Sequence, residues 1–310
     1  MCSLAFLTLA AVPTLSARPL IAQGFSDVEF EVTHVAGNVW VLDSGRGGNI
    51  GVSYGEDGFL IIDDQFAPLA DKIRAALGEI AGGDSGAPEF VLNTHWHGDH
   101  TGGNAEFAPD ATIIAHENVR VRLSTEQRRG TNVTPPAPAE AWPVITFHDG
   151  LSIHFNGEEV RVRHLPDGHT DGDAVVHFLS SNVVHLGDDF FAGRFPFVDI
   201  ASGGSVEGLE RAIAHVLENA PDDVRIIPGH GPLSDMNDLR LYHRMIVETI
   251  ESVRGQIAAG GSVDDVKAAG VSDEWDGWGS GFISTDRWLE TVFLSLSGSE
   301  GDGPMEHGHR

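Results

Sequence analysis

The stretch NTHWHGDHTGG, residues 93–103, places His95, His97, Asp99 and His100 within one short turn of the chain. All four side chains are typical metal ligands, and an apolar core has no need for four of them so close together. They follow PEFVL, residues 88–92, an apolar segment that predicts a strand. In a loop after a strand, the backbone can turn His95 and His97 towards one point. Asp99 and His100 would then face a second ion beside the first, so the stretch predicts half of a two-metal site.

The missing ligands are predicted further along the chain, because a catalytic zinc site has three protein ligands and one open position. Three later loops each offer one: His169 in LPDGHTDGD, Asp188 in VVHLGDDFF and His230 in RIIPGHGP. Each loop follows a predicted strand, and a rigid sheet can aim several such loops at one site. The predicted site has one metal on His95, His97 and His169, a second on Asp99, His100 and His230, and Asp188 as the bridge between them.

Strand and helix patterns divide the chain into two similar halves. The predicted strands lie within residues 28–65, 88–95, 111–116, 145–189 and 223–230. The predicted helices cover residues 67–83, 117–129, 205–220, 236–260 and 284–297. Residues 131–143 are rich in proline and predict a surface loop. Two such halves predict two β-rich layers with helices outside both.

The motifs H-x-H-x-D-H, G-H-T, G-D and G-H-G, in this order, resemble the metallo-β-lactamase superfamily from about residue 30 to residue 295. The resemblance implies an α/β fold, the four-layer αββα sandwich of that family, with the metals at one edge of the two sheets. It implies a bridging hydroxide as nucleophile and a catalytic role for Asp99, which would orient the hydroxide as well as bind metal. Two zinc ions per chain are the expected cofactors, because the ligand set is rich in histidine and lacks a thiolate.

The functional hypothesis is a dinuclear zinc hydrolase that opens an amide or ester bond, including a β-lactam ring with weak or promiscuous activity. Asp188 is the reason for expecting weak turnover, because many β-lactamases of the family have a cysteine at this position. A bridging carboxylate is instead the pattern of glyoxalase-II-like hydrolases, so a thioesterase of that kind and a lactonase remain alternatives. An alternative of another class is a mononuclear iron dioxygenase that acts on persulfides.

Four residues are candidates for substrate binding. Arg46, Gly47 and Gly48 lie in LDSGRGGNIG, residues 42–51, and a hairpin in this region folds over the metals in the family that the chain resembles. Arg194 follows the segment that carries Asp188 and would meet a carboxylate of the substrate. The alternatives are a simple hairpin for residues 42–51 and a solvated arginine for Arg194.

The formal net charge of −27 bears on the partners of the protein. Such a surface repels phosphate backbones, so we expect no nucleic acid among the partners. The expected partner is a small-molecule substrate. The oligomeric state does not follow from the sequence.

Both ends of the chain are expected to lie outside the catalytic unit. Residues 1–22 are expected to be a signal peptide, because residues 1–17 carry no side-chain charge and small residues permit cleavage near Ala17 or Ala22. The protein would then be periplasmic or secreted, with no stable membrane insertion after processing. Residues 23–297 are expected to form a single catalytic domain, and residues 298–310 a disordered tail.

Overall fold

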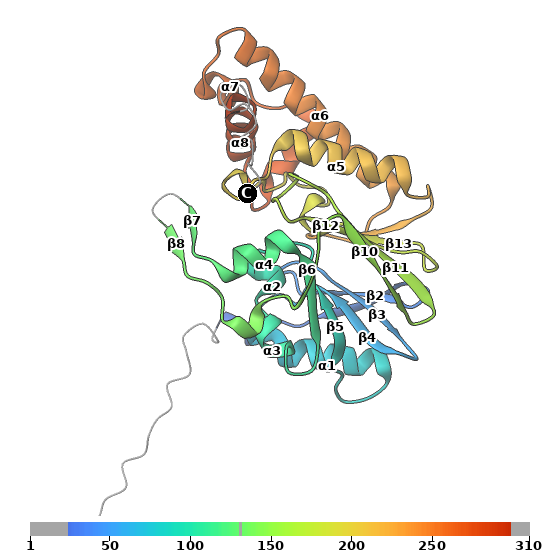
Figure 1. The fold of residues 1–310 in the computed structure, drawn as a ribbon. Helices are drawn as coiled ribbons and strands as arrows, with labels where there is room; N and C mark the ends of the chain where they lie inside the picture. Colours follow the sequence, from blue (N-terminus) through green and yellow to red (C-terminus); the bar gives the residue numbers. More distant parts are fainter. Residues whose placement is uncertain (1–23, 130–131, 299–310) are drawn as a thin grey trace, which may run out of the picture.

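Two β-sheets lie face to face at the centre of the molecule, and helices cover the outer face of each (Figure 1). The structure is a computed structural model that describes residues 24–129 and 132–298. The expected signal peptide and the expected tail, apart from Gly298, lie outside the described residues. Within them, the four layers run from α1 through the two sheets to the C-terminal helices, so the predicted αββα sandwich is confirmed.

The first sheet has seven strands in the order β1-β2-β3-β4-β5-β6-β9. They are β1 (Glu31–Ala36), β2 (Val39–Asp43), β3 (Ile50–Gly55), β4 (Gly58–Ile62), β5 (Pro88–Leu92), β6 (Thr112–His116) and β9 (Ile145–Phe147). The strands β1 to β4 are antiparallel neighbours, whereas β4, β5, β6 and β9 run parallel. Parallel strands need crossovers, and α1 (Ala70–Ala81) supplies the one between β4 and β5. The parallel strands therefore end at one common edge.

The second sheet has five strands in the order β10-β11-β12-β13-β14. They are β10 (Gly150–Phe155), β11 (Glu158–His164), β12 (Ala174–Phe178), β13 (Val183–His185) and β14 (Arg225–Ile227). All neighbours are antiparallel except β13 and β14, which α5 (Val206–Asn219) connects. The β11–β12 loop and the carboxyl ends of β13 and β14 consequently lie at the same edge of the sheet.

The apolar patterns of the strands account for the layers. In β4 every second residue faces the other sheet, so that Leu60 and Ile62 pack against residues such as Val176 and Phe178. The residues between them, such as Ile61, pack on the opposite side against α1. A strand that is buried on both faces reads as one continuous apolar run, and this is what FLII shows.

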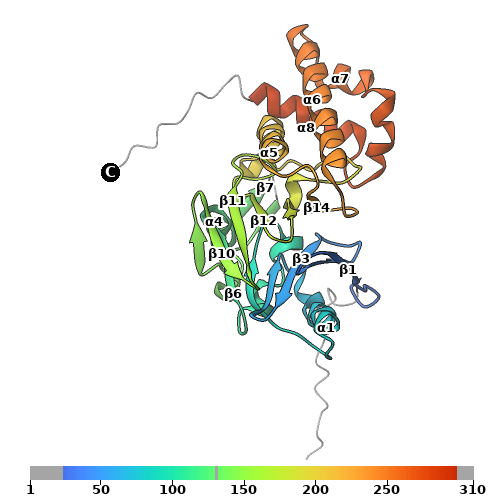
Figure 2. The ribbon, with the colours of Figure 1, turned by 90° about the vertical axis from the view of Figure 1, so that its right-hand side faces the viewer.

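The C-terminal helices gather on the outer side of the second sheet, opposite α1 (Figure 2). They are α5, α6 (Met236–Ala258), α7 (Val263–Ala269) and α8 (Thr285–Gly298), with the 3-10 segment η6 (Asp273–Ser280) between the last two. The shorter elements are η2 (Ala67–Leu69), α2 (Gly98–Thr101), α3 (Asn104–Phe107), α4 (Glu117–Ser124), η3 (Ala139–Ala141), η4 (Gly187–Asp189) and η5 (Ile200–Ser202). None of the described helices is both long and apolar enough to span a membrane.

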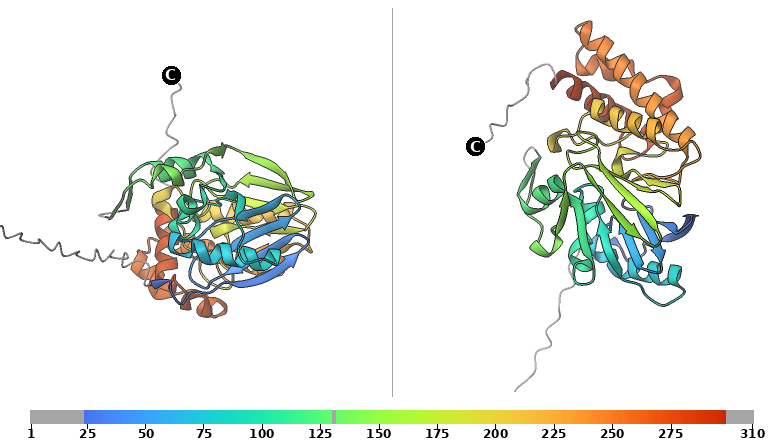
Figure 3. Two further views of the ribbon diagram at one scale, coloured as in Figure 1. Left: turned by 90° about the horizontal axis from the view of Figure 1, so that it is seen from below. Right: turned by 45° about the vertical axis from the view of Figure 1, so that its right-hand side comes forward.

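Two local predictions were wrong. The helix predicted over residues 117–129 ends at Ser124, because Thr125 adopts an extended conformation. The chain continues into a separate hairpin of β7 (Gln127–Arg129) and β8 (Asn132–Thr134), part of which lies in the predicted Pro-rich loop. This hairpin projects away from both sheets (Figure 3). Sequence periodicity does not reveal it, because strands of three residues are too short to show alternation.

Candidate metal centre

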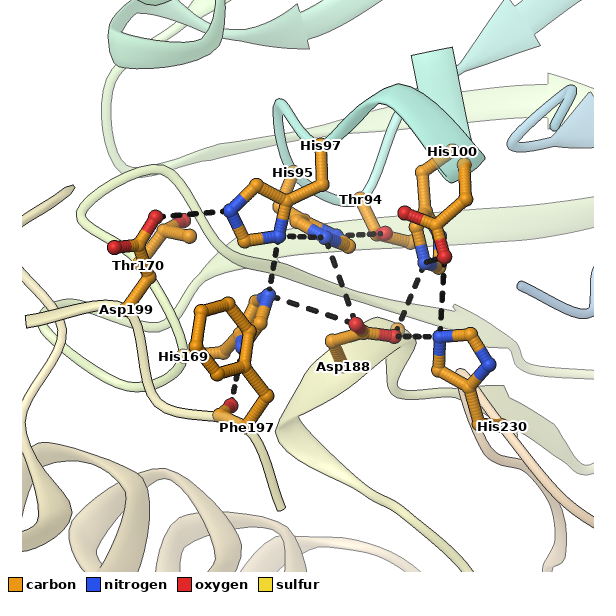
Figure 4. Close-up of polar contacts among 12 residues, drawn as sticks. Thr94, His95, His97, His100, His169, Thr170, Asp188, Phe197, Asp199 and His230 are labelled. Atoms are coloured by element: carbon orange, nitrogen blue, oxygen red, sulfur yellow. Dashed lines mark hydrogen bonds and ion pairs between the residues drawn. The ribbon is translucent and has the colours of Figure 1, made fainter. Parts of the chain in front are cut away.

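The seven predicted ligands come together where the loops of the two sheets meet (Figure 4). The first sheet contributes the loop after β5, with α2 as a single helical turn in it. The second sheet contributes the β11–β12 loop and the segments after β13 and β14. The side chains form two groups in which all ligand atoms lie within 4.8 Å of one another. The first cluster is His95, His97, His169 and Asp188, and the second cluster is Asp99, His100 and His230.

In the first cluster, three ring nitrogens face one point. The Nδ1 atom of His97 lies 3.2 Å from Nε2 of His95 and 2.8 Å from Nε2 of His169. The Oδ2 atom of Asp188 lies 3.8 Å from Nε2 of His95 and 3.5 Å from Nε2 of His169. All four side chains are buried.

In the second cluster, the other oxygen of Asp188 takes part. Its Oδ1 atom lies 3.1 Å from Nε2 of His100 and 3.3 Å from Nε2 of His230. The Oδ2 atom of Asp99 lies 3.6 Å from Nε2 of His100 and 3.4 Å from Nε2 of His230. Asp188 thus turns one carboxylate oxygen towards each cluster, which is the arrangement of a bridging ligand.

Hydrogen bonds on the far side of the rings fix which nitrogen of the first cluster carries the proton. Nε2 of His97 lies 2.9 Å from the Asp199 carboxylate, which only accepts. Nδ1 of His169 lies 2.6 Å from the carbonyl oxygen of Phe197, which also only accepts. Both rings therefore donate outwards, and the nitrogens that face the cluster carry lone pairs.

Asp63 holds one ring of each cluster. Its Oδ2 atom accepts from Nδ1 of His100 at 2.7 Å and from the Thr94 hydroxyl at 2.8 Å. Because that hydroxyl gives its hydrogen to Asp63, its oxygen accepts from Nδ1 of His95 at 3.0 Å. His95 and the neutral form of His100 therefore also turn lone pairs inwards.

A cation fits this arrangement of atoms. Three lone pairs of the first cluster face one another at hydrogen-bond distance with no proton between them. In the second cluster, Nε2 of His100 and Oδ1 of Asp188 are buried and have no hydrogen-bond partner among the described residues. Buried acceptors without donors are costly, and metal ions remove that cost. Nitrogen and carboxylate donors with no thiolate are the ligands of zinc and of similar divalent ions.

The charges of the clusters differ. Burial lowers the pKa of His95 well below its usual value and that of His169 to about 3, so these rings are neutral. Burial also disfavours the charged form of His230, but the carboxylates of Asp188 and Asp99 outweigh it and raise its pKa to about 9. Burial raises the pKa of Asp99, but the neighbouring His100 and His230 outweigh burial and lower this pKa to about 2. The second cluster therefore attracts positive charge.

Asp189, next to the bridging residue, binds the backbone of the β11–β12 loop and does not face the clusters. It is buried, and its Oδ1 atom accepts from the backbone N–H of His169 at 3.1 Å. Burial raises its pKa to about 7. Asp188 rather than Asp189 thus lies between the clusters, as the G-D motif predicts.

A cavity of about 550 Å³ opens beside the clusters. Its lining includes His97, Asp99, Asp188 and His230, together with Arg46, Gly47 and Arg194 among the residues predicted to bind substrate. Gly48 is not part of this lining. It lies against His100 instead, where a Cβ atom would come within 2.1 Å of the Cε1 atom of the ring.

Sequence reasoning missed the residues that orient the rings. Asp63 directly follows the apolar strand β4 in the segment LIIDDQ, and an acidic pair directly after a buried strand is a usable signal. Asp199 has no comparable signal, because it lies 102 residues from His97 along the chain. The part played by the Phe197 carbonyl depends on backbone geometry alone.

Comparison with known proteins gives one family match. The sequence profile described as the metallo-beta-lactamase superfamily matches residues 34–230. A hydroxyacylglutathione hydrolase from Gloeobacter violaceus is 29% identical over 168 residues, which cover 54% of this chain and 56% of that protein. The chain thus spans about half the length of this curated relative.

Solved structures share the fold. A metallo-beta-lactamase from Pontibacter korlensis matches with a TM-score of 0.57 and 17% identity, over 71% of this chain and 99% of that chain. A double mutant of the sec-alkyl sulfatase PisA1 matches with a TM-score of 0.65 and 16% identity, over 92% of this chain and 53% of that chain. At these identities the likeness concerns the fold alone.

Proposed function

Because this chain belongs to the metallo-β-lactamase superfamily, we propose that it is a dinuclear zinc hydrolase that opens an amide or ester bond. The observation that carries the proposal is Asp188, whose two oxygens face two separate clusters of ligand-type residues. Two zinc ions at these clusters would lower the pKa of a shared water and polarise the carbonyl group under attack. The proposal includes a β-lactam ring among the substrates, with low efficiency.

The proposal gives each residue of the two clusters a role in metal binding or catalysis. In the proposal, His95, His97 and His169 hold one ion, and His100, His230 and Asp99 hold the other, with Asp188 shared. The side chain of Asp99 is 30% exposed and lines the cavity, so it can accept a hydrogen bond from the attacking water and orient it. The shared carboxylate of Asp188 reduces the positive charge that a substrate meets, which is the reason for expecting weak β-lactam turnover.

A thioesterase is the second candidate. It is supported by the name of the relative from Gloeobacter violaceus and by the carboxylate at position 188. A lactonase has less support, because neither Tyr54 nor Tyr242 lines the cavity to stabilise an oxyanion. A mononuclear iron dioxygenase binds one metal ion, so that function would not explain the second cluster of ligand-type residues.

Metal content and substrate turnover test the proposal together. We expect about two zinc ions per chain in the untagged protein, measured by elemental analysis, and turnover of nitrocefin that a chelator abolishes. Two zinc ions with turnover of S-lactoylglutathione but not of nitrocefin would replace the β-lactam substrate by a thioester. About one iron per chain would contradict the hydrolase and favour the dioxygenase.

Two variants test the roles of the carboxylates. Asp99→Ala should lower kcat by roughly a hundredfold or more with the fold intact, because the attacking water loses its orienting acceptor. Asp188→Ala should lower the zinc content, because both clusters lose a ligand. Asp71→Ala is the matched control, since its side chain is 98% exposed and forms only a surface ion pair. Full activity in Asp99→Ala would contradict the proposed mechanism.

A further inference from the structure

Phe282 is the most exposed of the large apolar side chains in the described part of the chain, with 81% of its surface accessible. It lies between η6 and α8 and lines the cavity beside the clusters. Its ring packs edge-on against Phe197 at 6.4 Å. Removal of an apolar ring of this size from water by a ligand is favourable. A ligand bound in the cavity would cover the exposed surface of the Phe282 ring.

The segment around Phe282 is anchored on both sides. Ile283, the next residue, is buried in the core under the C-terminal helices. Trp278, four residues earlier, stacks on the buried ring of Tyr242, and its carbonyl oxygen accepts from the backbone N–H of Phe195. The backbone that carries the exposed ring is therefore held at the rim of the cavity.

Phe282 belongs to a group of phenylalanine residues that line the cavity, called the aromatic wall here, and members of this group contact the clusters. Phe191, Phe195 and Phe197 also line the cavity. The ring of Phe191 stacks on His230 with 5.1 Å between the ring centroids, and the carbonyl oxygen of Phe197 accepts from His169 (Figure 4). A group bound on this wall would be positioned directly beside the proposed reaction centre.

The same cavity contains two cationic side chains. Arg46 comes from the β2–β3 loop, and Arg194 lies beside Gly281 in the other half of the chain. Neither forms an ion pair within residues 24–129 and 132–298, although the sequence has 46 acidic and only 19 basic residues. Arginines left unneutralised in so acidic a protein favour a negatively charged ligand.

We propose that the substrate is a small amphiphilic anion, with an acyl or aryl group on the wall of Phe282 and Phe197 and an anionic group at Arg46 and Arg194. This rests on the proposed hydrolase function, which places the bond to be cleaved at the clusters. The cavity of about 550 Å³ lies within the range of roughly 300–1,000 Å³ that is common for small-molecule sites. The substrate is therefore a compact molecule rather than a polymer.

Binding of straight-chain carboxylates from butanoate to decanoate, measured by titration calorimetry on the zinc-loaded protein, tests the apolar wall. We expect Kd to fall by roughly threefold to fourfold for each added methylene group. Phe282→Ala should flatten this dependence and leave butanoate within about twofold of the wild-type value. Leu294→Ala is the matched control, because Leu294 is 53% exposed on α8 and does not line the cavity. Equal chain-length dependence in Phe282→Ala and in the wild type overturns the assignment of the wall.

Ester hydrolysis tests the anionic site. Decanoyl esters of 4-nitrophenol and of 4-hydroxybenzoate differ in the charge of the leaving group. Arg46→Gln and Arg194→Gln should each lower kcat/KM for the benzoate ester by roughly tenfold more than for the neutral ester. Equal losses on both esters overturn the role of the arginines. Chain-length-dependent binding without turnover of any ester contradicts the hydrolase but supports the apolar wall, so the two failures are distinguishable.

Discussion

Single residues behind the clusters decide whether the ligand nitrogens are available. Asp63 is the main one, because a single carboxylate oxygen takes the hydrogens of both Thr94 and His100. It does so from a left-handed backbone conformation with φ of 67°, which a non-glycine residue adopts at a cost. The cost is offset where the surrounding contacts fix the residue, and Asp63 is fully buried.

Asp63→Asn should therefore weaken metal binding at the second cluster. An amide can donate as well as accept, and it lacks the charge that favours the Nδ1 tautomer of His100. We expect zinc affinity to fall by roughly tenfold to a hundredfold, measured by competition with a chromogenic chelator. Asp71→Asn, at a position whose side chain is 98% exposed, should bind zinc like the wild type. Unchanged affinity in Asp63→Asn would remove the residue from this role.

Gly48→Ala tests the close approach of the β2–β3 loop to the second cluster. A Cβ atom at this position would lie 2.1 Å from Cε1 of His100, so the ring must move away from Asp188. We expect the variant to lose metal at the second cluster and keep it at the first, with about one zinc per chain by elemental analysis. Gly83→Ala is the control, because no atom lies within 4 Å of its added Cβ. Two bound ions in Gly48→Ala would show that the loop gives way instead of the ring.

Among the elements, those with a full period of pattern were predictable. The alternation in β1 to β4 and the helical spacing in α1, α5, α6 and α8 place these elements correctly. The hairpin of β7 and β8, the helix α7 and the segment η6 were not predicted, because each is too short or too polar to show a period. Local motifs placed the seven ligand-type residues, whereas Asp199 depends on a contact across 102 residues.

The helix α4 begins with a histidine side chain as its cap. Nδ1 of His116 accepts from the backbone N–H of Asn118 at 3.2 Å, and the ring stacks on His164 at 3.8 Å between centroids. Burial and the neighbouring His164 lower the pKa of His116 to about 4. The folded state thus keeps this ring neutral below the ordinary value of about 6.5, and the unfolded state takes up the proton first.

His116→Asn should keep the cap and remove the titration, because asparagine is a good first residue for a helix. As the pH falls from about 6.5 towards 4, the wild type should lose unfolding free energy relative to the variant. Urea denaturation of both chelated proteins at several pH values measures this difference. His154→Asn serves as a control on an exposed strand position. A difference that does not change with pH would contradict the lowered pKa.

For the whole molecule, the clusters connect the two sheets. The loop after β5 supplies one part of each cluster, and the loops of the second sheet supply the rest. Ions bound there would act in addition to the apolar layer between the sheets. Their contribution to stability should therefore be visible in global unfolding.

Removal of metal should lower the melting temperature. A ligand that binds only the folded state at about a thousand times its Kd stabilises it by roughly 4 kcal/mol, which corresponds to about 10 °C for a chain of this size. Thermal unfolding followed by circular dichroism, before and after chelation, measures the change. Added zinc should restore the melting temperature and added calcium should not, because calcium prefers oxygen ligands. An unchanged melting temperature after chelation would show that the clusters do not bind metal tightly.

The division of each cluster between the two sheets also limits how such a protein can vary over generations. A substitution in either half that displaces a ligand-type residue damages a cluster, and residues of the other half cannot replace it. The ligand positions of both halves are therefore constrained together. Substitutions at the rims leave both clusters intact, because Arg46 and Phe282 line the cavity without belonging to either cluster. Lineages that share the centre can therefore diverge in substrate by exchanging residues at those two rims.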